Sequence, residues 1–229
     1  MAHRVVLLGN SWVPRLESAV RNNHVLKEHL FKPREHVLSY LHEIDGKRLY
    51  LIQNLLDNKQ RIIQEVECCE ELIICIGGND VAEYPARIPE MVKELVQFAI
   101  DLHEWDIAKR VGFVECSPRL GETGFSATNV EFLPVNDEDG WEDAEDLYME
   151  KIKVFNALLR HDVEPHPDMF VVQLTGMFNC MWDWLLPHDG KHLTPLGNDK
   201  LYTCIKRATI KASKKPCHWD FKQIYGHEQ

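Results

Sequence analysis

Three short polar segments, far apart in the sequence, carry side chains that can together perform acyl transfer. They are Gly9-Asn10-Ser11, Gly77-Gly78-Asn79-Asp80 and Asp189-Gly190-Lys191-His192. In order from the N-terminus, they supply a hydroxyl group, a side-chain amide, and a carboxylate beside an imidazole. Acyl transfer needs a nucleophile, a base and hydrogen-bond donors for the oxyanion that develops. The three segments therefore predict a single site that cleaves esters.

The expected base for the serine hydroxyl is His192. A serine hydroxyl is a weak nucleophile until a base takes its proton, and His192 lies in a triad-like setting, three residues after Asp189. Within a single turn, this spacing lets the Asp189 carboxylate accept a hydrogen bond from one imidazole nitrogen while the other nitrogen faces Ser11. We predict a triad of Ser11, His192 and Asp189.

The expected donors for the oxyanion are the backbone N–H of Ser11, at the start of a helix, and the side-chain amide of Asn79. An asparagine can donate a hydrogen bond there, whereas an aspartate cannot. Loss of one such donor typically raises the barrier by about 3 kcal/mol. Gly78 directly precedes Asn79 and is assigned to the same oxyanion and substrate-binding group.

Each segment alone also has a simpler interpretation. Gly-Asn-Ser is a common helix-capping tripeptide, while Gly-Gly-Asn-Asp and Asp-Gly are common turns. The combination is more specific, because the segments occur in one order that suits one mechanism and lie where strands are expected to end. We therefore interpret them as parts of one site.

Hydrophobic periodicity predicts the elements that must position these segments. Short apolar runs typical of buried parallel strands each end in a polar loop, and they cover residues 4–9, 72–76, 111–115 and 169–174. Periodic stretches of helical length lie at about 47–66, 88–108 and 147–159. Alternating strands and helices predict a parallel sheet in a three-layer α/β/α sandwich. At the carboxyl edge of such a sheet, Ser11 and Asn79 are expected to meet.

Three further regions complete the expected layout. Residues 21–45 contain several apolar pairs that suit a strand or a helix, and we place a second strand there. Thr194 is expected to cap a final helix that has Pro195 as its first residue and runs to about Arg207. The acidic segment 136–146 is interpreted as a solvated loop or helix entry, with a substrate lid as the alternative.

Length and charge limit the possible functions. A chain of 229 residues suits one α/β domain, which we place at 1–210, followed by a basic tail at 211–229. The formal net charge of -10 and the isoelectric point of about 5.6 disfavour non-specific binding to nucleic acid. Contacts with phosphates need a clustered basic face. A small-molecule or lipid ester is the expected substrate.

The sequence also predicts the setting in which the chemistry takes place. It shows no signal-peptide core and no run of membrane-spanning length, so we expect a soluble, cytoplasmic protein. The seven cysteines, of which Cys68 and Cys69 are adjacent, predict free thiols rather than a disulfide framework. Cys116 has no evident base beside it in sequence and is interpreted as a buried thiol. No cysteine or histidine spacing matches a standard metal module, and we expect neither a metal nor a cofactor.

Two pairs of residues leave alternatives open. His161 and His166 bracket acidic residues, which suits either a metal site or, as we interpret it, a solvated loop. Trp182 and Trp184 precede the Asp189 turn, where they can line an acyl or alcohol pocket or pack against the edge of the sheet.

The three segments resemble the signature blocks of the SGNH hydrolases, also called GDSL-type esterases and lipases. Gly9-Asn10-Ser11 is similar to the nucleophile block, Gly77 to Asp80 to the asparagine block, and Asp189 to His192 to the final Asp-x-x-His block. Their order and approximate spacing agree with the family over nearly the whole chain. The resemblance implies a flavodoxin-like three-layer sandwich with about five parallel strands, and hydrolysis of carboxylic esters without a cofactor.

The chain departs from the family pattern at two places. The usual first block reads Gly-Asp-Ser-Leu, whereas this chain has Asn10 and Trp12. The family's glycine block, which supplies a third oxyanion donor, has no clear counterpart here; Gly46 is the best candidate on spacing, but its neighbours Asp45 and Lys47 are unlike the usual motif. The chain also resembles the esterase-like domains of some retrotransposon-encoded proteins. The changed glycine block and the basic tail motivate an alternative function, a catalytically silent SGNH-like module that binds RNA or a protein partner.

Overall fold

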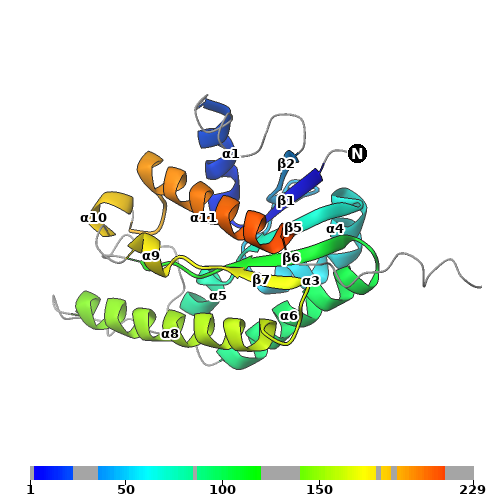
Figure 1. The fold of residues 1–229 in the computed structure, drawn as a ribbon. Coiled ribbons are helices and arrows are strands. Elements are labelled where there is room, and N and C mark those ends of the chain that lie inside the picture. The colour runs from blue at the N-terminus through cyan, green and yellow to red at the C-terminus, as the bar shows by residue number, and fades with distance from the viewer. Residues whose placement is uncertain are drawn as a thin grey trace, which may run out of the picture.

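A parallel sheet forms the centre of the molecule (Figure 1). The structure is a computed structural model that describes residues 3–22, 36–84, 87–119, 140–178, 182–186 and 190–214. Within these residues, the sheet has five strands: β1 (His3–Gly9), β2 (His36–Leu41), β5 (Cys69–Cys75), β6 (Ala108–Val114) and β7 (Met169–Val172). Their order across the sheet is β2-β1-β5-β6-β7. Counted along the chain, this is the 2-1-3-4-5 order of flavodoxin-like folds, as predicted.

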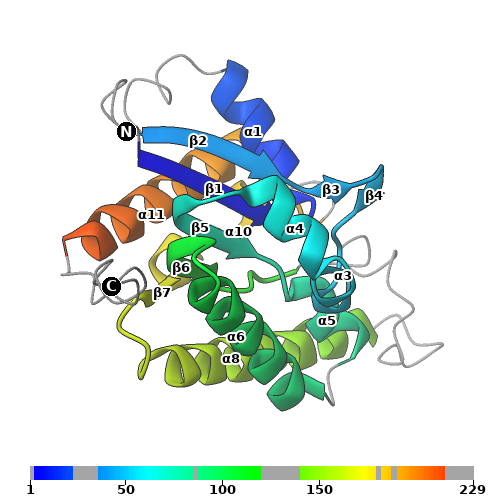
Figure 2. The same cartoon turned by 90° about the vertical axis from the view of Figure 1, so that its right-hand side faces the viewer.

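Alternate side chains of the strands face two separate hydrophobic cores. In β1, Val6 and Leu8 face one core, and Val5 and Leu7 face the other. This alternation follows from the two-residue repeat of a strand, and a strand buried on both faces must be apolar throughout. The predicted three-layer sandwich is confirmed, because helices cover both faces of the sheet (Figures 1 and 2).

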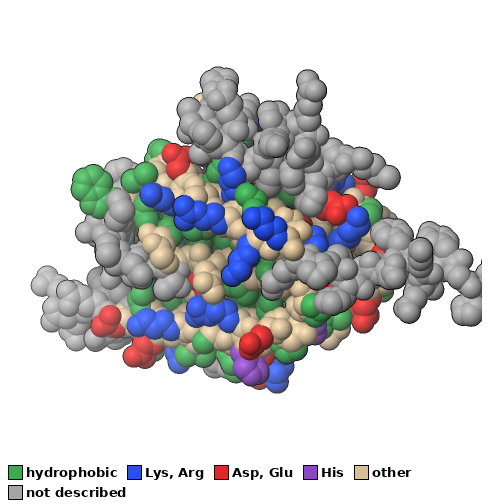
Figure 3. Space-filling view, viewed as in Figure 1, with side chains coloured by type: hydrophobic (Ala, Val, Ile, Leu, Met, Phe, Trp, Pro, Cys, Tyr) green, Lys and Arg blue, Asp and Glu red, His purple; other side chains and the backbone are tan. Residues whose placement is uncertain are grey.

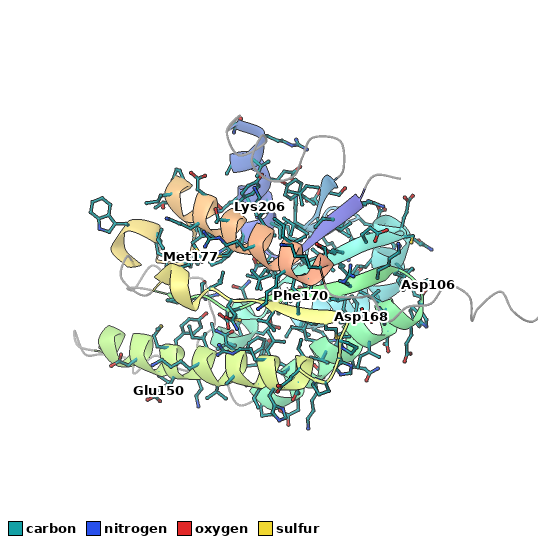
Figure 4. The ribbon with its side chains drawn as sticks, in the orientation of Figure 1. Asp106, Glu150, Asp168, Phe170, Met177 and Lys206 are labelled. Carbon is teal, nitrogen blue, oxygen red and sulfur yellow. The ribbon has the colours of Figure 1, made fainter. Side chains whose placement is uncertain are left out.

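The first core is covered by helices from the middle of the chain. They are α3 (Ile52–Asp57), α4 (Lys59–Val66), α5 (Gly78–Glu83), α6 (Ile88–Glu104) and α8 (Gly140–Val163). Helices from the two ends of the chain cover the second core: α1 (Trp12–Asn22), α9 (Thr175–Phe178), α10 (Trp182–Leu185) and α11 (Pro195–Ser213). In Figure 4, Phe170 of β7 and Met177 of α9 lie on this second side.

The loop that contains Ser11 lies directly before helix α1. Its buried side chains include Trp12, Leu16 and Val20, which are four residues apart and therefore share one helical face. That face packs on the sheet and against α11. The helix that follows Ser11 is thus fixed to the helix that follows His192.

The final helix begins where the sequence predicts. The Thr194 hydroxyl accepts a hydrogen bond from the Gly197 N–H at 3.0 Å, and Pro195 occupies the first helical position. The helix continues to Ser213, beyond the expected end near Arg207. Thr209 and Ala212 are buried, so the additional turns pack against the protein.

The prediction of one helix over residues 47–66 is wrong for the first residues of that segment. Asp45 and Gly46 both have positive φ, 49° and 74°, and connect β3 (Glu43–Ile44) to β4 (Lys47–Arg48) in a short antiparallel hairpin. Asp-Gly is a strong signal for such a turn. The rest of the segment forms two helices, α3 and α4, which are separated at Asn58.

Other boundaries also differ from the sequence prediction. Strand β2 confirms the strand placed within 21–45. Helix α6 ends at Glu104, and Ala108, which was included in that helix, begins β6. Helix α8 starts at Gly140, so residues 140–146 are helical, whereas 136–139 lie outside the described residues. Among the described helices, none is both long and apolar enough to cross a membrane.

Candidate active site

The loops after β1 and β5 lie side by side at the carboxyl edge of the sheet. Gly9 is paired with Cys75 in the parallel register, and the Asn10 N–H donates to the Cys75 carbonyl oxygen at 3.0 Å. A Cβ atom on Gly9 would lie 2.1 Å from that same oxygen, so only glycine allows the strands to approach this closely. Strand β1 lies between β2 and β5. A flavodoxin-like sheet forms its ligand crevice where its first and third strands are neighbours, and here these strands are β1 and β5.

The structure brings Ser11 and His192 into direct contact. His192 Nε2 lies 2.9 Å from Ser11 Oγ, although the two residues are 181 positions apart in the chain. This distance suits a serine hydroxyl that donates to a neutral imidazole, the arrangement in which the imidazole can take the proton. Both side chains are partly exposed, so a substrate can reach them.

Trp12 and Asn10, which differ from the usual first block, organise the loop that contains Ser11. Asn10 Oδ1 accepts a hydrogen bond from the Trp12 N–H at 3.1 Å. The Trp12 indole Nε1–H donates to the Lys191 carbonyl oxygen at 2.9 Å. One side chain therefore links the segment that carries Ser11 to the segment that carries His192. Both departures are visible in the sequence, whereas their structural role is visible only in the fold.

Asn79 lies in the first turn of α5, after a glycine that the packing requires. Gly77 has a φ of 117°, and a Cβ atom on it would lie 2.7 Å from Phe155 Cζ. The Asn79 side-chain Nδ2 donates to the Tyr50 carbonyl oxygen at 3.1 Å, and its Oδ1 accepts a hydrogen bond from Arg119. The amide is therefore held at both ends.

The Asp80 carboxylate holds the beginning of α3 against the segment from Gly77 to Asp80. Its Oδ1 accepts a hydrogen bond from the Ile52 N–H at 2.8 Å, and the residue is only 3% exposed. Burial raises the pKa of the Asp80 carboxyl from 3.8 to about 7, although the hydrogen bond from Ile52 opposes the shift. Asp80 was not assigned a role from the sequence, where it appeared only as part of a polar turn.

The loop after β6 and helix α8 supply residues that sequence reasoning missed. Arg119 is buried and donates from Nη2 to the Gly78 carbonyl oxygen at 3.2 Å as well as to Asn79. The Asn156 side chain accepts from the Cys116 N–H at 2.8 Å and donates to the Cys116 carbonyl oxygen at 3.0 Å. Cys116 is buried, as expected, and burial raises the pKa of its thiol well above the usual value. Ser117-Pro118-Arg119, which follows an apolar run, was the available sequence signal for this loop.

A cleft of about 820 Å³ opens over these side chains. Such a volume suits a small ligand or part of a larger one. Residues from every segment described above line it: Ser11, Trp12, Tyr50, Gly78, Asn79, Ser117, Arg119, Tyr148, Lys191 and His192. The Ser11 hydroxyl, the His192 imidazole and the Asn79 amide therefore lie along one cavity.

Comparison with known proteins identifies the architecture. No protein-family model matches the sequence, and no curated protein matches it. Solved structures do match. A lipase/acylhydrolase from Enterococcus faecalis has a TM-score of 0.59 and 17% identity, covering 93% of this chain and 98% of its own. A protein from Slackia heliotrinireducens that is assigned to the SGNH hydrolases has a TM-score of 0.54 and 15% identity, covering 91% and 100%.

A GDSL-like lipase from Bacteroides thetaiotaomicron also matches, with a TM-score of 0.55 and 19% identity, covering 91% of this chain and 88% of its own. The chain has the SGNH-hydrolase fold. In this fold, the loops that carry Ser11, Asn79 and His192 occupy one edge of the sheet.

Two glycines predicted from the sequence to belong to the site, Gly78 and Gly46, lie at different distances from the cleft. Gly78 lines the cleft. Gly46 forms the turn of the β3–β4 hairpin, where a Cβ atom added to it would have no other atom within 4 Å, and it is not among the described residues that line the cleft. Asp189 lies outside the described residues, so its contact with His192 stays a prediction.

The structure also bears on the alternatives left open by the sequence. The interpretation of a loop is wrong for His161, which lies in the last turn of α8, with its Nδ1 2.9 Å from Asp162 Oδ1 on the helix surface. Across the described part of the chain, no group of three or more histidine, cysteine or acidic residues could hold a metal ion. Trp184 is 70% exposed, so most of its side chain does not pack against the sheet edge, and it is not among the described residues that line the cleft. The side chain of Trp182 lies outside the described part of the structure.

Proposed function

We propose that the protein is a serine hydrolase of carboxylic esters, with Ser11 as its nucleophile and His192 as its general base. The observation that carries this proposal is the 2.9 Å contact between Ser11 Oγ and His192 Nε2 inside the cleft. The fold, shared with lipases and acylhydrolases, gives independent support.

The proposed reaction has two balanced halves. Ser11 Oγ attacks the ester carbonyl carbon as its proton passes to His192 Nε2, and the carbonyl oxygen becomes an oxyanion. The C–O bond to the alcohol then breaks, and the alcohol leaves with the proton from His192. Water attacks the acyl-enzyme by the same route and releases the acid, which restores the Ser11 hydroxyl.

The proposed oxyanion donors are the Ser11 N–H and the Asn79 side-chain amide. Ser11 directly precedes α1, where backbone N–H groups have no partner within the helix. One hydrogen of the Asn79 amide is directed to Tyr50, which leaves its second hydrogen for the oxyanion. Asp189 is proposed to orient His192 and to stabilise the imidazolium that forms. Gly46 remains the sequence-based candidate for a third donor.

The test is turnover of p-nitrophenyl acetate and its longer acyl homologues by wild type and Ser11→Ala, together with labelling by a fluorophosphonate. We expect the variant to lose turnover by at least about 10³-fold and to lose all labelling. Ser117→Ala is the matched control, since Ser117 is another serine that lines the same cleft. Undiminished hydrolysis by folded Ser11→Ala would refute the proposal.

The second candidate function is a catalytically silent module that binds RNA. Its support is a row of basic side chains along α11 and at its C-terminal cap (Figure 3), formed by Lys200, Lys206, Arg207, Lys211 and Lys214. Phosphate binding through this row would weaken steeply as salt increases. Absence of RNA binding by the wild-type protein at low salt would remove this candidate. A preserved Ser11–His192 contact favours the hydrolase.

A further inference from the structure

Arg119 is a buried cation beside the proposed oxyanion donor. It is 5% exposed and lies in the loop after β6. Its Nη2 donates to Asn79 Oδ1 at 2.5 Å and to the Gly78 carbonyl oxygen at 3.2 Å. A buried guanidinium is usually paired with a carboxylate, because removing an unpaired charge from water is costly. Here Nη2 of Arg119 instead donates to two neutral oxygens of the Gly78-Asn79 segment.

The guanidinium determines which way the Asn79 amide points. A guanidinium has only donors, so it can face the amide oxygen but not the amide NH2 group. The opposite end of the amide meets the Tyr50 carbonyl oxygen, 3.1 Å from Nδ2. Rotating the amide by half a turn would set NH2 against the guanidinium and oxygen against oxygen. The two contacts therefore favour the same single orientation.

This orientation is the one that an oxyanion donor needs. With Oδ1 occupied by Arg119, the NH2 group is the remaining polar end of the side chain. A positive charge at the amide oxygen also draws electron density from the amide nitrogen, which makes its N–H a stronger donor. An Asn79 amide that rotated freely would present its oxygen to the oxyanion for part of the time.

Tyr148 holds Arg119 in place. The Arg119 guanidinium carbon lies 5.4 Å from the centre of the Tyr148 ring, a cation–π distance. The Tyr148 hydroxyl lies 3.3 Å from the Gly78 carbonyl oxygen and 3.2 Å from that of Ser117. Helix α8 thereby supports both the loop that carries Arg119 and the segment that carries Asn79.

We infer that Arg119 is a positioning residue that orients and polarises the Asn79 amide as an oxyanion donor. The inference rests on the proposed ester hydrolysis, because it assigns Arg119 a part in the same site. It predicts that Arg119 acts through Asn79 rather than by binding the substrate directly.

The test is a double-mutant cycle on kcat with p-nitrophenyl acetate, using Arg119→Met, Asn79→Ala and the double variant. Asn79→Ala should lower kcat by about 10²- to 10³-fold, as for other oxyanion donors. Arg119→Met should lower kcat by about 10- to 100-fold and leave KM within about twofold. In the Asn79→Ala background, the same change should alter kcat by less than about threefold, because the amide through which it acts is gone.

Arg119→Lys and Arg87→Met are the controls. Lysine keeps the charge and one donor, so it should recover part of the kcat that methionine loses. Arg87 lies on the surface and pairs with Glu94, so its replacement should leave kcat unchanged. Thermal unfolding of each variant reports folding, and Arg119→Lys replaces Arg119→Met in the cycle if the methionine variant does not fold.

The outcomes separate this inference from the proposed function. No turnover by folded wild type would overturn both. Turnover that is lost in Ser11→Ala, combined with Arg119 and Asn79 effects that multiply, would overturn only the inference. A rise in KM of much more than twofold in Arg119→Met would likewise overturn it, because Arg119 would then bind the substrate directly.

Discussion

Trp12 Nε1 and the Lys191 carbonyl oxygen are joined by a hydrogen bond of 2.9 Å. The bond connects the residue after the proposed nucleophile to the residue before the proposed base. These two segments come from opposite ends of the chain, and the contact between Ser11 and His192 is itself made by side chains. Because one partner of the Trp12 bond is a backbone atom, this bond helps to fix the separation of the two segments.

Trp12→Phe should lower kcat for ester hydrolysis by about 5- to 20-fold. Phenylalanine keeps most of the apolar packing of α1 but cannot donate to Lys191, so the Ser11–His192 distance becomes less well defined. Loss of one hydrogen bond should also lower the free energy of unfolding by about 1 kcal/mol. Trp105→Phe, at an exposed position, is the matched control. Steady-state kinetics and chemical denaturation measure both effects, and an unchanged kcat would contradict the role of this bond.

Asp80→Asn should remove a pH dependence from the stability of the protein. The raised pKa of the Asp80 carboxyl, about 7 against 3.8, means that the folded state keeps a proton that the unfolded state has already released. This contribution to stability is fully present below about pH 4 and is lost as the pH rises through about 7. The full shift corresponds to about 4 kcal/mol at most.

Asparagine keeps the acceptor for the Ile52 N–H but does not titrate. The difference in unfolding free energy between wild type and Asp80→Asn should therefore change between about pH 4 and pH 7 and stay constant above about pH 8. Urea titrations across that range measure it. The exposed Asp57, changed to asparagine, is the control. A constant difference throughout would show that the Asp80 pKa is not raised.

Gly77→Ala should lower the free energy of unfolding by about 2 to 4 kcal/mol. The alanine would have to adopt a φ of 117° and would place its methyl group 2.7 Å from Phe155 Cζ. Gly176→Ala is the control, because no atom lies within 4 Å of the added Cβ atom. Alanine should be neutral or slightly stabilising in that helix. Equal stability of the two variants, measured by thermal unfolding, would show that the Gly77 turn can relax.

The cysteines should react with a maleimide in an order set by burial. Among the cysteines that the structure describes, Cys68 is exposed and should be modified first. Cys75 and Cys116 are buried, and burial raises the pKa of the Cys75 thiol to about 12 and that of Cys116 well above the usual value. Because the thiolate is the reactive form, both should react only when the protein unfolds. Mass spectrometry of peptides from native and denatured protein distinguishes them, and early labelling of Cys116 would refute its assignment as an inert thiol.

The sheet and two parts of the proposed site could be predicted because each has a local signal. Apolar runs that end in Gly-Asn-Ser or Gly-Gly-Asn-Asp identify strands and the loops after them, and parallel pairing then places Ser11 near Asn79. The β3–β4 hairpin also has a local signal in Asp45-Gly46, but the helical periodicity of the residues after it obscures that signal.

Arg119, Tyr148 and Asn156 could not be assigned roles from the sequence, for a physical reason. Their contacts with Asn79, Gly78, Ser117 and Cys116 join elements that are 31 to 70 residues apart. No periodicity encodes such side-chain pairings, because they depend on how α8 packs against the edge of the sheet. The same limit explains why the role of Trp12 became clear only in the fold.

Ser11 and His192 are 181 residues apart in the chain, so a single break between them would place them on separate fragments. A break anywhere between β6 and β7 would leave the hydroxyl and the amide on one fragment and the imidazole on the other. Neither fragment alone would contain a complete acyl-transfer apparatus. Hydrolysis by a mixture of the two would then report directly on their complementation, with reassociation of β7 beside β6 as the event that restores it.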